Sequence, residues 1–418
     1  MRAAPFTAPY IVCLALLSTL SAPAIAQSGR AATLAAAADT TPDPIRIAVG
    51  RLDLEKYKAT IKGLTQFGDR RQGTKRNRDA VDWIEAQLKS YGCSNTERVT
   101  YDFQPPPPRD SAGRGRGGGR GGAPRTGPGS AQGGGTPRGI RARTGVNNDS
   151  LAQPDARLRA LDTEQTTPGQ RQEVYCTKIG TTHPNEMYIV GGHMDGIGWG
   201  EAANDDGSGT ALVMELARVF SSPDIQTERS IRFALWNNEE SGTNGSRAYV
   251  VQRQALQGKE EPAGSGKYPE PTWLGMIQHD MMMFDHGMPH EDGTLSKEQR
   301  PEADVNIEFQ VTSKFAADAQ KLAWALATAN EKYATDYPAA VGQHMTNTDS
   351  GPFQDVVPAI SLRENERGAQ IGNGWDPHWH QPTDLFATFT DKDFRLGLNA
   401  AQTTLAGVAQ LTGLTIKK

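Results

Sequence analysis

The sequence predicts an α/β protein, a three-layer α/β/α sandwich on a mixed, mostly parallel central sheet. Two observations predict this fold. From residue 172 onward, short apolar runs of strand length alternate with longer stretches of helical periodicity. Polar and acidic side chains follow directly after several of these apolar runs, which is where open α/β sheets place their sites.

The N-terminus has the pattern of a secretory signal peptide over residues 1–26. Arg2 gives a positive start, residues 10–20 form an apolar segment, and Ala24 and Ala26 complete an A-x-A cleavage site. The apolar run falls short of the ~20 residues that span a bilayer, and no later segment is apolar enough, so we expect no membrane span. We expect a secreted or periplasmic protein in which residues 27–45 form a disordered lead-in.

The first predicted elements of the folded part lie between residues 46 and 103. Apolar residues recur at helical spacing over residues 47–64. A second helix covers residues 80–91, with Trp83, Ile84 and Leu88 on one face and Gly92 at its end. Residues 97–103 predict a strand.

Residues 104–170 interrupt this pattern and predict a disordered insertion within one domain that spans residues 46–418. Residues 105–108 are all proline, and residues 113–135 are mostly Gly, Arg and Pro. Eight arginines against one aspartate between residues 109 and 143 leave the rest of the chain far more acidic than the net charge of −4 indicates. Such a segment buries too little apolar surface to offset its ordering entropy. Arg-Gly repeats also occur in RNA-binding segments, but in an exported chain we favour a solvated insertion and expect no nucleic-acid partner.

The rest of the chain is regular. Strands are predicted at residues 172–179, 187–191, 230–236, 273–277, 305–311 and 359–362, and helices at residues 209–220, 242–256, 316–333 and 391–411. The two cysteines after the signal segment, Cys93 and Cys176, leave open a disulfide or two free thiols.

The candidate site residues follow the predicted strands. His193 and Asp195 follow one strand, with Asp205 in the next loop, while Glu239 and Glu240 follow a second strand. The remaining candidates are Asp280 after a third strand and His380 before the last helix. Each alone has an ordinary explanation, as a surface histidine, a solvated acidic pair or a helix cap. As an ordered set on a strand–helix pattern they predict a metal centre, in which a tight Gly-rich loop presents Asp205 as a bridge and one glutamate stays free as a base.

Six motifs carry a resemblance to a known family. They are GHMD at residues 192–195, ANDDGSG at 203–209, WNNEESG at 236–242, QHDM at 278–281, TDSGPF at 348–353 and HQPTD at 380–384. With them the chain resembles the co-catalytic di-zinc aminopeptidases of the bacterial leucyl and Streptomyces type, which are related to glutamate carboxypeptidase and glutaminyl cyclase. The resemblance covers about residues 47–412 apart from the insertion.

This resemblance implies a role for each residue. His193 and Asp280 would hold one Zn²⁺ and Glu240 and His380 a second, with Asp205 bridging the two ions. Glu239 would be the general base for a metal-bridging hydroxide, and Asp195 would accept the far N–H of His193 and fix its tautomer. Some relatives carry a Tyr before the TDSGPF motif as an oxyanion donor; it is missing here, and His344 is the substitute we predict.

The resemblance implies a zinc-dependent exopeptidase acting on peptides, with an aminopeptidase as the first expectation. Carboxypeptidase or dipeptidase action, or a glutaminyl-cyclase-like aminoacyl transfer, is the alternative. A receptor-like domain that has lost its ligands is disfavoured, because every ligand is present. Side-chain preference and oligomeric state stay open.

Overall fold

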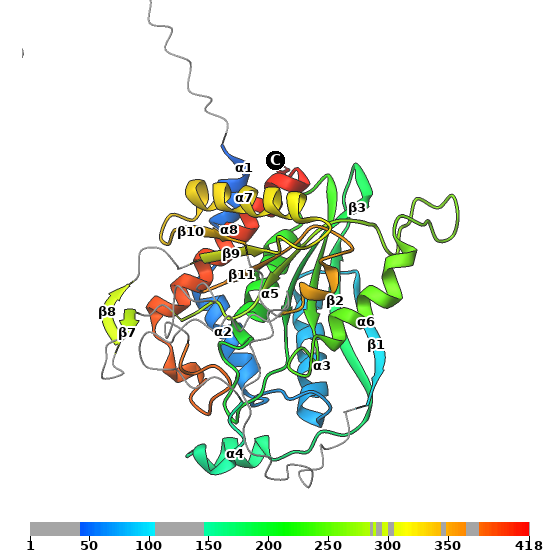
Figure 1. Ribbon diagram of the computed structural model, residues 1–418. Helices are drawn as coiled ribbons and strands as arrows, with labels where there is room; N and C mark the ends of the chain where they lie inside the picture. The colour runs from blue at the N-terminus through cyan, green and yellow to red at the C-terminus, as the bar shows by residue number, and fades with distance from the viewer. Residues whose placement is uncertain are drawn as a thin grey trace, which may run out of the picture. The chain divides into compact units, whose positions relative to one another are not determined.

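The computed structural model describes residues 42–104, 146–284, 287–289, 295–299, 305–343, 348–364 and 376–417. Within them an eight-stranded sheet has the order β1-β2-β5-β3-β6-β11-β9-β10 (Figure 1). Its strands are β1 (Thr96–Phe103), β2 (Gly169–Lys178), β3 (His183–His193), β5 (Arg229–Trp236), β6 (Thr272–His279), β9 (Val305–Phe309), β10 (Ala339–Gly342) and β11 (Ala359–Arg363).

The centre of the sheet is parallel and its edges are mixed. Strands β5, β3, β6 and β11 run parallel to one another, and β10 runs parallel to β9. Strands β1 and β2 pair antiparallel, as do β2 with β5 and β11 with β9. This arrangement confirms the predicted mixed, mostly parallel sheet. It also brings the carboxyl ends of β5, β3 and β6 to one edge.

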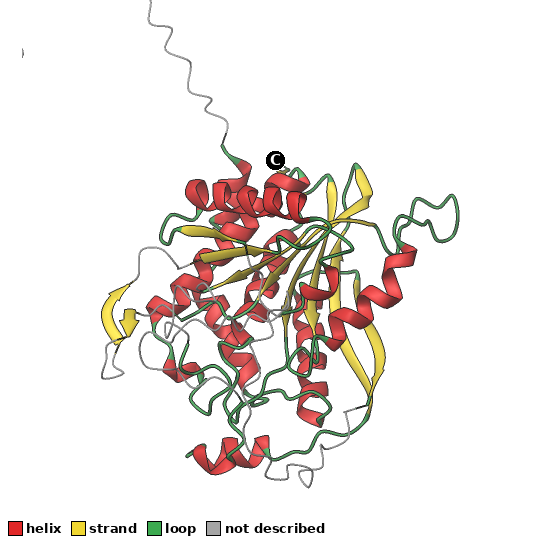
Figure 2. Ribbon diagram, viewed as in Figure 1, coloured by secondary structure: helices red, strands yellow, loops and turns green. Residues whose placement is uncertain are grey.

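Helices lie on both faces of the sheet, as Figure 2 shows. Successive strand residues alternate between two apolar clusters: Phe233 and Leu235 pack into one, and Ala234 and Trp236 into the other. The first cluster is formed with α2 (Leu54–Thr65), α3 (Lys75–Ser90), α5 (Gly207–Phe220), α7 (Ala316–Tyr333) and α8 (Asp391–Thr412). The second is formed with α6 (Asn244–Arg253) and the 3₁₀ turn η4 (Gly351–Phe353). The predicted α/β/α layering is therefore present.

Several element boundaries differ from the prediction. The segment 47–64 forms two helices, α1 (Pro44–Val49) and α2, because Asp53 caps the second and accepts hydrogen bonds from the N–H groups of Glu55 and Lys56. Helix α3 starts at Lys75, directly after its N-cap Thr74 and five residues before the predicted helix. Short pairings that the sequence did not predict are β4 (Ile225–Gln226) with β12 (Thr415–Ile416), β7 (Gly287–Pro289) with β8 (Leu295–Gln299), and β10 with β9.

The predicted insertion 104–170 is wrong in its second half. Residues 146–168 form a 3₁₀ turn, η2 (Ser150–Ala152), and the helix α4 (Ala156–Asp162). This segment has few apolar residues, and buried polar groups such as Gln153 and Asp162 hold it in place instead. The signal segment, most of the lead-in and residues 105–145 lie outside the described residues.

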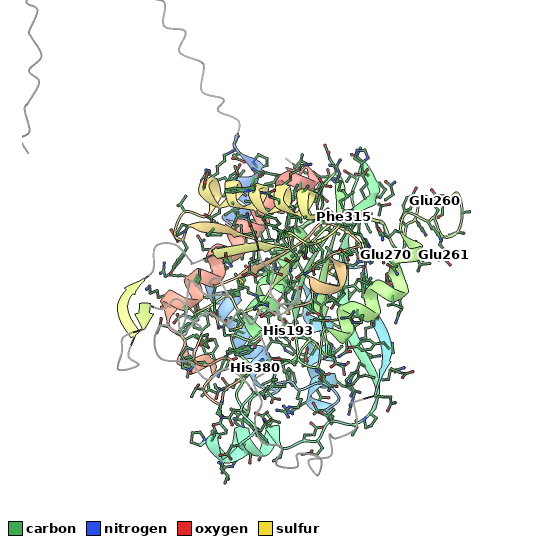
Figure 3. All side chains as sticks on the ribbon, in the orientation of Figure 1. His193, Glu260, Glu261, Glu270, Phe315 and His380 are labelled. Atoms are coloured by element: carbon green, nitrogen blue, oxygen red, sulfur yellow. A yellow bond between two sulfur atoms is a disulfide. The ribbon has the colours of Figure 1, made fainter. Side chains whose placement is uncertain are left out.

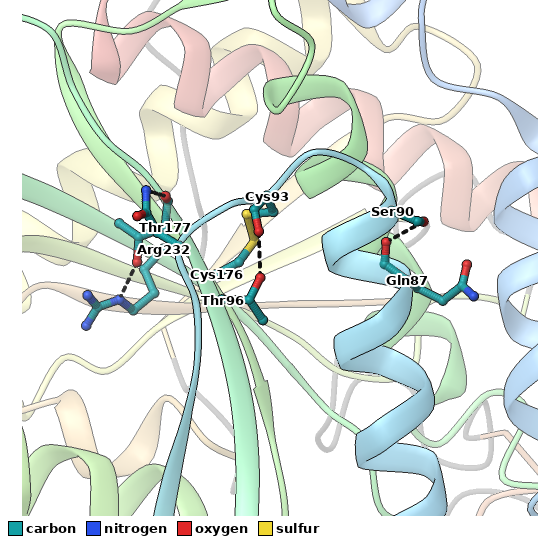
Figure 4. The surroundings of a disulfide bond; sticks show 8 residues. Gln87, Ser90, Cys93, Thr96, Cys176, Thr177 and Arg232 are labelled. Atoms are coloured by element: carbon teal, nitrogen blue, oxygen red, sulfur yellow. Dashed lines mark hydrogen bonds between the residues drawn. A yellow bond between two sulfur atoms is a disulfide. The ribbon is translucent and has the colours of Figure 1, made fainter.

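Cys93 and Cys176 form a disulfide between the end of α3 and strand β2 (Figure 4). This settles the alternative that the sequence left open. No helix within the described ranges is both long and apolar enough to cross a membrane.

Candidate metal centre

His193 is the last residue of β3, and its backbone is fixed on both sides. Its N–H donates to Asp206 Oδ2 at 2.9 Å, and its carbonyl accepts from Thr210 Oγ1 at 2.7 Å. Ring atom Nδ1 lies 3.0 Å from the backbone oxygen of Asp195, which makes Nδ1 the donor and leaves Nε2 free to bind a cation. Asp195 does accept from the far N–H of His193, through its backbone oxygen, while its carboxylate Oδ1 lies 3.9 Å from Nδ1.

The Asp195 carboxylate serves the neighbouring loop instead. Its Oδ1 accepts a hydrogen bond from the N–H of Glu239 at 3.0 Å, just beyond β5. The side chain therefore links the loop after β3 to the loop that carries Glu239 and Glu240. Asp195 thus faces His193 with its backbone oxygen and holds the backbone at Glu239 with its carboxylate.

Asp205 lies in the loop between β3 and α5, and this loop is held through its backbone. Asp384 accepts hydrogen bonds from the N–H groups of Asn204 and Asp205 at 2.8 and 3.1 Å. Asp206 caps α5 through Gly209 N at 2.8 Å and also accepts from Met281 N at 3.1 Å. Because these bonds hold the loop through its backbone and through Asp206, the Asp205 carboxylate can face His193 and His380.

His380 reaches the same place from the loop before α8. Its φ of +57° is left-handed, which is rare for a residue with a side chain. Gly198 packs directly against it: a Cβ there would lie 2.3 Å from the carbonyl carbon of His380. Asn147 N donates to the His380 oxygen at 3.0 Å, and Trp379 stacks on the imidazole at 4.1 Å. His380 and His193 are labelled in Figure 3.

The five predicted ligands form two groups that share Asp205. In the first, His193 Nε2 lies 3.3 Å from Asp205 Oδ1 and 3.8 Å from Asp280 Oδ1. In the second, His380 Nε2 lies 3.0 Å from Asp205 Oδ2 and 2.9 Å from Glu240 Oε2. Ligands of a tetrahedral Zn²⁺ at ~2.0–2.1 Å lie about 3.3 Å from one another, so both groups have the spacing of a zinc site. Asp205 offers one oxygen to each group.

The charges at this centre also fit a cation. Burial raises the pKa of Glu240 to about 7 and that of Glu239 well above its ordinary value. Burial opposes protonation of His193, but the Asp205 and Asp280 carboxylates outweigh it and raise the pKa of the imidazole well above its usual range. Buried carboxylates at this density need positive charge, from protons or from metal ions. Among the described residues, Glu240 Oε1 and His380 Nδ1 have no hydrogen-bond partner.

Several residues that hold the centre were not singled out from the sequence. Arg70 is buried and donates to the carbonyls of Met194, Glu201 and Ala202. Glu364 accepts from Asn204 Nδ2 and from the N–H groups of Met283 and Phe284. Glu364 follows the predicted strand 359–362, a signal that could have found it, whereas Arg70 follows no predicted strand. His344, the predicted oxyanion donor, lies outside the described residues.

With this geometry established, comparison with known proteins identifies the family. Residues 174–402, more than half of the chain, match Peptidase family M28. The chain belongs to this family. All five predicted metal ligands and Glu239 fall inside the M28 match.

Curated relatives align with the chain over short segments. Leupeptin-inactivating enzyme 1 of Streptomyces exfoliatus is 40% identical over 67 residues, which are 16% of this chain and 15% of that protein. Carboxypeptidase Q of Xenopus laevis is 32% identical over 71 residues, 17% of this chain and 15% of that protein. The chain therefore aligns with less than a sixth of either relative.

Solved structures share the M28 fold over most of the chain. The aminopeptidase from Aneurinibacillus sp. strain AM-1 has a TM-score of 0.57 at 21% identity, covering 88% of this chain and 96% of that one. A zinc aminopeptidase from Bacillus subtilis has a TM-score of 0.56 at 14% identity, covering 86% and 96%. Porphyromonas gingivalis glutaminyl cyclase has a TM-score of 0.52 at 16% identity, covering 86% and 99%.

Proposed function

We propose that this M28 protein is a zinc-dependent exopeptidase that works with two metal ions, most directly as an aminopeptidase. The observation that carries the proposal is the shared carboxylate of Asp205, which offers one oxygen to each of two ligand groups. A single ion would be held by only one of the two groups, which would leave the ligands of the other group buried without a cation.

In this proposal His193 and Asp280 hold one Zn²⁺, Glu240 and His380 hold the other, and Asp205 bridges them. Two zinc ions bound there would polarise a substrate carbonyl and lower the pKa of a water molecule to near neutrality. The chain fixes its ligands in advance, through Nδ1 of His193 and through the backbone contacts of Asp206 and Asp384.

Glu239 is the proposed general base. It belongs to neither ligand group, yet it neighbours Glu240 and is held by the Asp195 carboxylate through its own N–H. Its carboxylate takes a proton from the attacking water and returns it to the leaving amine. Burial raises its pKa, which suits a group that must exchange protons near neutral pH.

The direction of cleavage is part of the proposal. Short matches to proteins named as aminopeptidases favour removal of N-terminal residues, and the match to carboxypeptidase Q keeps carboxypeptidase or dipeptidase action as the alternative. Aminoacyl transfer of the glutaminyl cyclase kind is less favoured, because this chain has two complete ligand groups and an additional glutamate. We further propose that the protein is exported, which the disulfide between Cys93 and Cys176 supports.

The test combines metal analysis with a substrate panel. Protein purified without chelators should contain close to two equivalents of zinc by mass spectrometry, and EDTA should abolish hydrolysis until Zn²⁺ or Co²⁺ is restored. Aminoacyl nitroanilides, N-terminally blocked peptides and an N-terminal glutaminyl peptide then separate aminopeptidase, carboxypeptidase and cyclase activity. Protein with only trace metal, or equal activity with and without EDTA, would rule the proposal out.

A further inference from the structure

A cavity of about 140 Å³ lies between α3 and β2, away from the five metal ligands. A water molecule takes up about 30 Å³ in the liquid, so the cavity has room for a small polyatomic ion. Its lining contains two arginines and no acidic residue: Gly73, Asn77, Arg78, Val81, Gln170, Arg171 and Gln172.

Arg171 is a buried guanidinium without a carboxylate partner in the part of the chain that is described. Its side chain is 3% exposed, and all its hydrogen bonds go to uncharged oxygens. Nε donates to Gln72 Oε1 at 2.6 Å and Nη2 to the Thr167 carbonyl at 2.7 Å, while Nη1 donates to the carbonyls of Gly169 and Gln170. Neutral acceptors satisfy the geometry of a guanidinium but leave its charge uncompensated in a buried place.

Arg78 adds a second positive charge to the same cavity. It is exposed, and no hydrogen bond or ion pair of its side chain is found among the described residues. The acids nearest to it in sequence are engaged elsewhere, Asp79 with Lys75 and Asp82 with Arg98. Burial lowers the pKa of Arg171 and repulsion from Arg78 lowers it further, while Tyr101 and the Asp195 carboxylate raise it without cancelling the fall.

We propose that this cavity binds a small oxyanion, such as phosphate or a carboxylate, between Arg78 and Arg171. Guanidinium groups match oxyanions because their N–H donors form charge-assisted hydrogen bonds to paired oxygens. Gln172 can add a neutral donor, because its Oε1 is already occupied by Arg98 Nη1 at 2.9 Å and its amide nitrogen faces no acceptor within the described residues. The oxyanion would neutralise the charge that the protein itself leaves unbalanced.

The cavity wall is connected to the loop that carries Glu239. Asn237 Nδ2 donates to the Gln172 carbonyl at 2.7 Å and to Asn77 Oδ1 at 3.0 Å, so the wall of the cavity holds the residue two positions before Glu239. Because of this connection, the oxyanion could come from either of two sources. One is a free ion from solution. The other, which rests on the proposed peptidase function, is the C-terminal carboxylate of a short peptide substrate.

The first arm of the test measures binding without turnover. Inorganic phosphate is titrated calorimetrically, at constant ionic strength, into the zinc-loaded wild type, Arg78→Ala, Arg78→Lys and the control Arg157→Ala, which removes an exposed arginine from α4. Any phosphate that binds at the metal centre should bind equally to all four proteins and so does not affect the comparison. The cavity predicts an additional binding event that weakens about tenfold or more in Arg78→Ala, is partly kept in Arg78→Lys and is unchanged in Arg157→Ala.

The second arm identifies the source of the oxyanion. Peptides with a free C-terminal carboxylate are compared with their amides in wild type and Arg78→Ala. A rise in KM for the free acids alone identifies the substrate carboxylate, whereas loss of phosphate binding with unchanged KM identifies a free ion. Phosphate isotherms and KM values that do not differ between Arg78→Ala and wild type would overturn the oxyanion site. A wild type without peptidase activity would refute the proposed function but leave the phosphate arm valid.

Discussion

Arg363 Nη2 donates a 2.7 Å hydrogen bond to Oδ2 of Asp280, while Oδ1 of the same carboxylate lies 3.8 Å from His193 Nε2. Both side chains are buried. One oxygen of Asp280 is thereby committed to a protein cation and the other to the ligand group. The second group has a different environment, because Glu240 has one oxygen without a hydrogen-bond partner among the described residues. The two halves of the centre are therefore electrostatically unequal.

Replacing Arg363 should destabilise the metal-free protein more than the zinc-loaded protein. Arg363→Met leaves the buried Asp280 carboxylate without its guanidinium, a loss that costs about 3–5 kcal/mol in buried ion pairs. A zinc ion on Oδ1 supplies positive charge in its place and should recover part of the loss. Urea unfolding of wild type and variant, with and without zinc, measures both values. Equal losses in the two states would show that Arg363 does not share Asp280 with the metal.

Removing the proposed base should separate catalysis from metal binding. Glu239→Gln keeps the size of the side chain but cannot take a proton, so turnover should fall about 10²–10⁴-fold with zinc content unchanged. The matched variant Glu240→Gln should instead lower zinc content, because Glu240 belongs to a ligand group. Metal analysis and steady-state kinetics on both variants make the comparison. A Glu239→Gln protein with near-normal turnover would remove Glu239 as the base.

Gln153 should determine how firmly the His380 loop is held. It is buried, and its Nε2 donates to the Trp199 carbonyl at 2.7 Å and the Pro382 carbonyl at 3.0 Å, which joins the loops after β3 and before α8. Gln153→Leu removes the donor from one buried carbonyl, at about 1–3 kcal/mol, and from a second that is partly buried and costs less.

The expected result for Gln153→Leu is lower stability and, in the proposed two-zinc centre, weaker binding of the ion that His380 would hold. Exposed Gln165 on the same segment gives the control Gln165→Leu, which should change stability by less than ~0.5 kcal/mol. Zinc titration with a competing chelator resolves the two affinities. If both leucine variants bind zinc alike, the hydrogen bonds of Gln153 do not support His380.

The residues that the structure gathers into the two groups could be singled out because most of them stand next to a signal that a single sequence carries. His193, Glu240 and Asp280 follow apolar runs of strand length, and strand ends meet at one edge of a parallel sheet. Among the supporting residues, Arg363 also follows a predicted strand, but nothing in the sequence shows which residue its guanidinium contacts. Arg363 is found beside Asp280 only because β11 pairs with β6, and Asp384 reaches the Asp205 backbone from 179 residues away.

The contacts that the sequence did not predict have a common physical origin. The sequence places Asp195 two residues after His193, but it does not show that the carboxylate turns toward the Glu239 N–H. Composition marks residues 146–168 as too polar to fold, yet buried hydrogen bonds of Gln153 and Asp162 hold them. Hydrophobic periodicity predicts helices and strands but not polar contacts between segments that are distant in the sequence, and the wrong predictions concern such contacts.

Asp162 should make stability fall as the pH rises through neutrality. Its Oδ1 accepts from Arg76 Nη1 at 2.9 Å and from the N–H of Asp69 at 3.2 Å, yet burial, reinforced by the Asp69 carboxylate, raises its pKa to about 8. In the unfolded chain an aspartate has a pKa of about 3.9. Between these two values the folded protein binds the proton and the unfolded chain does not, so the stabilisation is complete below about pH 4 and is lost as the pH rises through 8.

Asp162→Asn is neutral throughout and should flatten the fall in unfolding free energy between pH 5 and 8, while the exposed control Asp102→Asn should follow the wild type. Parallel curves for wild type and Asp162→Asn in urea unfolding would show that Asp162 is already ionised in the folded protein.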